Sequence, residues 1–154
     1  MLKRIVAMLS LLALFCATAS AQSVRRQVTS LSAKYKNEKG VISMICDSGI
    51  ALGSVKMMLR KGFGRAFADN ITAFAIIYYK DAHTSTRTRL ASDIDAITTK
   101  MQPIDVKEKM KGKGDADGFI RLTESGEYIT DLLILSTSPH PSLIYIEGRF
   151  KAEK

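Results

Sequence analysis

The residues whose spacing best fits a known chemistry lie in the segment KGDADGFIRLTE, at positions 113–124. Aligned with the calcium loop of an EF-hand, Asp115, Asp117 and Glu124 take ligand positions, and Gly118 takes the position where the loop turns. Lys113 stands where the first ligand should be, and a β pattern follows where a helix should begin. We therefore expect a hairpin turn with no bound metal or other cofactor. Asp115, Asp117 and Glu124 stay as candidate ligands for a surface calcium ion.

A second group of residues could bind anions. Lys107, Lys109, Lys111 and Lys113 alternate with other residues, so in a strand their ammonium groups would lie on one face. Such a face could contact an acidic glycan, lipid headgroups or an acidic protein. The alternative is a solvated strand whose lysines discourage edge-to-edge association. No aromatic residues interleave the lysines, as single-strand nucleic-acid binders require, so nucleic acid is not an expected partner.

The remaining chemistry-bearing residues show no catalytic arrangement. His83 and His140 are the two histidines, and neither has a second His or Cys at metal-ligand spacing. The chain has no nucleophile elbow and no Walker or dinucleotide glycine pattern. The sequence therefore predicts no catalytic residues and favours a non-enzymatic protein. The alternative is a small hydrolase or ligand-binding enzyme that uses His83 or His140.

The sulfur-containing residues are predicted to serve packing. Cys46 ends the apolar run VISMIC, which favours a buried hydrophobe over a nucleophile. The methionines beyond the N-terminal segment mostly fall on expected apolar faces, so core filling is favoured over copper binding. These methionines are Met44, Met57, Met58, Met101 and Met110.

The first 21 residues resemble a secretory signal peptide. Lys3 and Arg4 precede an apolar run, and the small residues at 19–21 fit a peptidase site. The run is too short to span a bilayer, so we expect no transmembrane span in the mature chain. Cys16 raises the alternative of a lipidated N-terminus, but the bulky Phe15 before it disfavours that processing. The domains are thus a signal peptide at 1–21 and one globular domain at 22–154.

Periodicity in the mature chain predicts the elements that position these residues. Apolar residues at helical spacing predict helices at 24–35, 49–61 and 85–101. We expect Gly62 to end the second helix, and Thr84, Ser85 or Thr86 to cap the N-terminus of the third. Apolar runs predict buried strands at 41–46 and 71–79, and alternation predicts four strands between 104 and 150. The apolar face of the second helix is expected to comprise Ala51, Leu52, Val55, Met58 and Leu59.

The order α-β-α-β-α-β-β-β-β predicts an α+β fold. We expect two layers, with three helices on one side of a mixed or antiparallel sheet that ends in a four-strand antiparallel meander. The composition agrees with a globular domain, since 46% of the residues are hydrophobic and 25% are charged, with a formal net charge of +8.

The chain also resembles a family of exported bacterial proteins, domain of unknown function 4252. The residues that carry the likeness are the strand at 41–46 with its Met-rich helix, the strand at 71–79, and the segments GEYITDLLIL and LIYIEGRF near the C-terminus. The resemblance implies a periplasmic or envelope α+β domain with a sensing or accessory role, and it supplies no catalytic motif.

The export signal, the positive charge and the lack of a catalytic motif together favour one function. We expect an exported protein, periplasmic or associated with the outer membrane, that acts as a binding or accessory module. Its expected partner is an envelope protein or an anionic envelope polymer.

Overall fold

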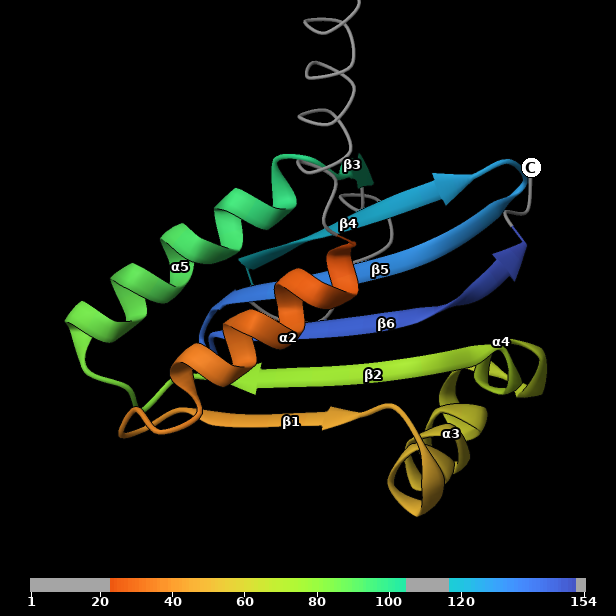
Figure 1. Cartoon of the computed structure of the whole chain (residues 1–154), viewed down its shortest axis with the longest axis horizontal. Coiled ribbons are helices and arrows are strands. Elements are labelled where there is room, and N and C mark those ends of the chain that lie inside the picture. Colours follow the sequence, from red (N-terminus) through yellow and green to blue (C-terminus); the bar gives the residue numbers. More distant parts are fainter. Residues whose placement is uncertain (1–22, 105–116, 152–154) are drawn as a thin grey trace, which may run out of the picture.

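The computed structural model describes residues 23–104 and 117–151 (Figure 1). The predicted signal peptide, Cys16 and the lysines at 107–113 lie outside these ranges. The helices are α2 (Val24–Tyr35), α3 (Gly49–Phe63), α4 (Arg65–Asp69) and α5 (Thr84–Thr98). The strands are β1 (Ile42–Cys46), β2 (Ile71–Tyr78), β3 (Gln102–Ile104), β4 (Asp117–Ser125), β5 (Tyr128–Ser138) and β6 (Ser142–Lys151). None of the helices in this part of the chain has the length and apolar character needed to cross a bilayer.

The six strands form one sheet in the order β1-β2-β6-β5-β4-β3, and every described pair of neighbours is antiparallel. This confirms the α+β class and the C-terminal meander, because β3 to β6 follow one another in both sequence and space. Strand β6 joins the meander to β2, which lies inside the sheet as its continuous apolarity predicts.

Helices α2 and α5 cover one face of the sheet and enclose the larger core. Alternate residues of the central strands point to this face, and Ile77, Leu133 and Leu143 are almost completely buried there. Leu90 and Ile94 of α5 are also fully buried, and Val28, Leu31 and Tyr35 of α2 complete this core. We call it the main core.

Helices α3 and α4 pack on the opposite face, which corrects the expectation that all helices share one side. Phe74 and Ile146 alternate with the main-core residues and contact Val55 of α3 and Phe67 of α4 in a second, smaller core. Figure 1 shows α3 and α4 gathered at the end of the sheet where β1 ends and β2 begins. The remainder of this face has no helix over it among the described residues, and Ile76 and Ile144 there stay partly exposed.

Three local expectations differ from the structure. Helix α3 continues through Gly62 to Phe63 and ends at Gly64, whose positive φ of 87° favours glycine. The short helix α4 occupies the segment expected to be a loop. Helix α5 is capped by His83, whose Nδ1 accepts a hydrogen bond from the Ser85 amide, and not by a hydroxyl residue.

Strand β1 lies at the edge of the sheet, and this corrects its expected burial. Cys46 is buried as predicted and is a free thiol. Ile42 and Met44, on the same face as Cys46, are exposed because the uncovered part of the second face begins there. Of the methionines expected in the core, Met101 is buried, while Met44, Met57 and Met58 are exposed. Met110 lies outside the described residues.

Candidate functional site

The structure describes only some of the residues that the sequence predicts to bind ions. The four lysines at 107–113 and Asp115 lie outside the described residues, so the anion-binding face stays a prediction. Asp117 begins β4, and Glu124 lies near its end with an exposed side chain. No group of three or more acidic, His or Cys side chains within 23–104 and 117–151 is arranged to hold a metal ion. The calcium candidate therefore also stays a prediction.

The two histidines lie apart from each other. His83 is exposed at the start of α5, where its Nδ1 lies 2.9 Å from Ser85 Oγ. His140 is exposed in the turn between β5 and β6. Neither of them lines either of the two surface pockets described below.

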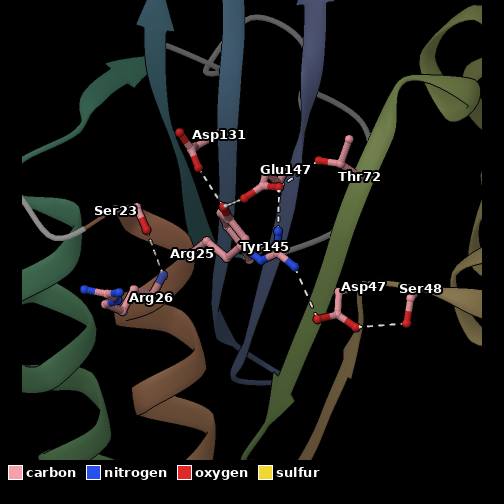
Figure 2. A network of polar contacts seen from close by, with 9 residues as sticks. All are labelled: Ser23, Arg25, Arg26, Asp47, Ser48, Thr72, Asp131, Tyr145 and Glu147. Atoms are coloured by element: carbon pink, nitrogen blue, oxygen red, sulfur yellow. Dashed lines mark hydrogen bonds and ion pairs between the residues drawn. The ribbon is translucent and has the colours of Figure 1, made fainter.

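A polar network centred on Tyr145 lies on the helix-covered face of the sheet (Figure 2). Tyr145 is 2% exposed, and its hydroxyl donates to Asp131 Oδ1 at 2.6 Å across the β5–β6 pair. The same hydroxyl oxygen lies 3.3 Å from Glu147 Oε2. Because a phenol carries one proton, it can donate to only one carboxylate at a time. The shorter distance shows that Asp131 is the acceptor.

Glu147 is held by donors on two other elements. Its Oε1 accepts from Thr72 Oγ1 of β2 at 2.7 Å and from Arg25 Nη1 of α2 at 3.2 Å. The second guanidinium nitrogen of Arg25 reaches Asp47 Oδ2, also at 3.2 Å, just after β1. Arg25 therefore fastens the first turn of α2 to β6 and to the end of β1, as Figure 2 shows.

The environment of Tyr145 suits it to structural hydrogen bonding. Burial raises the pKa of Tyr145 far above its usual value, and the hydrogen bond and charge of Asp131 and the charge of Glu147 raise it further. The phenol is thus protonated at all physiological pH values and cannot serve as a base. Through Arg25, the network positions α2 on the sheet.

A second polar cluster joins α2 to α5. Asp93 Oδ2 accepts from Lys34 Nζ at 2.6 Å and from Tyr35 Oη at 2.7 Å. These two hydrogen bonds lower the pKa of Asp93 below its usual value, because both favour the ionised carboxylate. A shallow surface pocket beside the cluster has Lys34 and Asp93 in its lining, already paired with each other. This cluster too is suited to holding two helices together.

The most unusual surface of the molecule is the outward side of α3. Ile50, Met57 and Met58 are 90%, 65% and 61% exposed, and Phe63 at the end of the helix is exposed as well. At helical spacing, Ile50 and Met57 project away from Val55, which faces the sheet, and Met58 lies at the margin between the two sides. We call Ile50, Met57, Met58 and the neighbouring Lys61 the α3 surface. Soluble monomers rarely gather large apolar side chains on an exposed face without a binding role.

The charged residues of α3 itself are all basic. The helix carries Lys56, Arg60 and Lys61 and contains no acidic residue. Arg60 is paired with Asp69 of α4, with Nη2 and Oδ1 2.5 Å apart, whereas Lys61 has no ion pair among the described residues. The surface therefore combines exposed apolar side chains with net positive charge.

Sequence reasoning placed Met58 on the buried face, although the pattern of 49–63 also shows apolar residues around the whole helix. Such a pattern does not show which side of the helix stays uncovered.

No family model matches the chain, and comparison with the curated proteins and with the solved structures finds no match either. The resemblance to domain of unknown function 4252 therefore stays an expectation from the sequence.

Proposed function

We propose that this chain is an exported, non-enzymatic binding module that attaches to an anionic lipid surface of the cell envelope through the α3 surface. The observation that carries the proposal is the exposure of Ile50, Met57 and Met58 on a helix that has basic residues and no acidic ones. Helices with this combination lie in the interface of a bilayer, with apolar side chains among the acyl chains and basic ones among the headgroups. The export signal predicted at 1–21 is consistent with an envelope location.

The expected energies are sufficient for reversible attachment. Removing a Met or Ile side chain fully from water contributes about 1.5–3 kcal/mol, and a shallow insertion gives part of that. A Lys or Arg near an anionic leaflet contributes about 1 kcal/mol. Three apolar side chains and the unpaired Lys61 thus give a favourable total of several kcal/mol, part of which offsets the loss of free motion on binding.

Helix α3 is folded with one side against the sheet before any contact with a bilayer. Val55 is buried against the sheet, with Leu52 and Leu59 partly buried beside it, so the opposite side of α3 is presented outward in a fixed orientation. Because α3 is already folded, its exposed side needs no folding step on contact with a bilayer. This lowers the entropic cost of binding.

Co-sedimentation with lipid vesicles tests the proposal. The protein is purified after export, and its N-terminus is checked by mass spectrometry, because an uncleaved apolar leader would itself bind lipid. We expect binding to vesicles that contain phosphatidylglycerol, and much weaker binding to pure phosphatidylcholine. Absence of binding to both kinds of vesicle would refute a lipid surface and leave an envelope protein as the partner.

Two variants and one control locate the contact. Replacing Met57 and Met58 together by Ser should weaken vesicle binding about tenfold or more, because both side chains are exposed and their loss leaves the core intact. Lys61→Gln should weaken binding about fivefold, and added salt should abolish that difference. Lys100→Gln removes an equal charge after α5, on the other layer, and should change little. Equal losses in Lys61→Gln and Lys100→Gln would show that only net charge matters.

A further inference from the structure

A shallow pocket of about 310 Å³ lies between the first half of α5 and the end of the sheet at which β2 and β5 end and β6 begins. Thr84, Arg87, Thr88 and Ala91 of α5 form one wall. Tyr79, Thr137 and Pro141 form the other wall. The pocket is on the side of the sheet that α2 and α5 cover, and it shares no residue with the α3 surface.

Tyr79 is a buried tyrosine whose hydroxyl has an open hydrogen-bonding position. The residue is 4% exposed, and its hydroxyl has no hydrogen-bond partner among the residues that the structure describes. Every fully buried side-chain nitrogen or oxygen in these residues has a partner, so the Tyr79 hydroxyl must reach solvent. Tyr79 lines the pocket, and we infer that its hydroxyl meets solvent there. Because water can satisfy this hydroxyl in the free protein, a ligand oxygen in the pocket can take the place of that water.

Arg87 brings an uncompensated positive charge to the same pocket. No described carboxylate lies within ion-pair distance of its guanidinium, which donates a long hydrogen bond to Thr84 Oγ1 at 3.5 Å. The first turn of α5 contains no acidic residue, and the N-terminus of a helix favours negative charge. Arg89, two residues on, is instead paired with Glu38.

We propose that this pocket binds a small organic anion. Its acidic group pairs with Arg87 near the start of α5, and one of its oxygens accepts a hydrogen bond from the Tyr79 hydroxyl. Its apolar part lies against Ala91, Pro141 and the ring of Tyr79. Burial, with a further contribution from the charge of Asp95, raises the pKa of Tyr79, so the phenol is protonated and able to donate. The small volume limits the ligand to about the size of one ring with its acidic group.

Titration of the purified protein with benzoate, followed by the backbone amide signals of residues 84–91, tests the proposal. Phenyl phosphate is the second probe, and the tighter of the two identifies the preferred acidic group as a carboxylate or a phosphate. Benzyl alcohol has the same ring without charge. We expect saturable shifts with at least one anion and much weaker binding of the alcohol. No saturable shift with either anion, or equal binding of the alcohol, would overturn the proposal.

Three variants assign the contacts. Arg87→Gln should weaken binding of the anion about tenfold, because it removes a charge-assisted hydrogen bond. Tyr79→Phe keeps the ring and removes the donor, and it should weaken binding severalfold. Arg89→Gln is the matched control on the same helix and should bind as the wild type does. A loss in Arg89→Gln equal to that in Arg87→Gln would show a general charge effect and would contradict the site.

Discussion

Replacing Tyr145 by Phe should destabilise the protein, because it removes a hydrogen bond to a carboxylate and leaves the buried ring in place. The hydroxyl of Tyr145 donates to Asp131 Oδ1 at 2.6 Å, and the residue is almost fully buried. In Tyr145→Phe, Asp131 Oδ1 must accept a hydrogen bond from water instead. Water has little access to this face of the sheet, because α2 and α5 cover it. Asp131 Oδ2 keeps the Thr130 hydroxyl at 2.9 Å.

The size of the effect follows from the kind of bond that is lost. Hydrogen bonds to a charged group contribute about 1.5–3 kcal/mol to stability. We therefore expect the free energy of unfolding to fall by about 2 kcal/mol. For a domain of this size, that corresponds to a fall of roughly 5–10 °C in Tm.

Urea unfolding at neutral pH measures the change, and Tyr79→Phe is the matched control. Both tyrosines are buried, but the Tyr79 hydroxyl has no partner among the described residues, so its removal should cost less than about 0.5 kcal/mol. A double-mutant cycle of Tyr145→Phe with Asp131→Asn should give a coupling energy of about 1–2 kcal/mol. Equal losses in the two Tyr→Phe variants, or no coupling with Asp131, would refute the role assigned to the bond.

Two further predictions concern the helix pair and one turn. Asp93→Asn should lower the free energy of unfolding by about 1–2 kcal/mol at neutral pH, because it removes the charge that binds Lys34 and Tyr35. The folded-state pKa of Asp93 is below its usual 3.8, so this stabilisation is present above that value and is lost as the pH falls through the folded pKa. Urea unfolding from neutral pH to about pH 2 should therefore show the two proteins converging in acid, and a constant difference would contradict the assignment. Gly40→Ala should cost about 2 kcal/mol or more in thermal unfolding, because Gly40 has a φ of 80° and an added Cβ would lie 2.1 Å from Asp81 O. A change below about 0.5 kcal/mol would show that the turn can relax.

The sequence predicted the fold class and the strand meander because hydrophobic periodicity reports which residues face a core. Helix α2 and strand β2 have one clear apolar pattern each, and both form where expected. The pattern does not report whether a face is covered. The patterns at 41–46 and 49–61 predict mostly core methionines, yet Met44, Met57 and Met58 are exposed, because β1 is an edge strand and α3 has one side away from the sheet.

The polar network was beyond sequence reasoning for a different reason. Asp131, Tyr145 and Glu147 are visible as polar residues in apolar strands, and Tyr145 and Glu147 share a face at a spacing of two. Their partners depend on the strand register and on the position of α2, since Arg25 lies far from Glu147 in sequence. Pairing between distant segments becomes visible only when the topology is known. The sequence likewise does not show that the Tyr79 hydroxyl lacks a hydrogen-bond partner among the described residues.

The two cores of unequal size imply that the protein does not open as one unit. The main core is enclosed by α2, α5 and the central strands. The smaller core includes the buried residues Val55, Phe74 and Ile146, and the hydrophobic residues packed around it are only partly buried. Sub-global opening of the segment from β1 to α4 should therefore require less free energy than global unfolding. Amide protons of β5 and β6 should then exchange with deuterium slowest, and those of α3 much earlier. The segment from β1 to α4 can therefore unfold and refold locally while the rest of the domain stays folded.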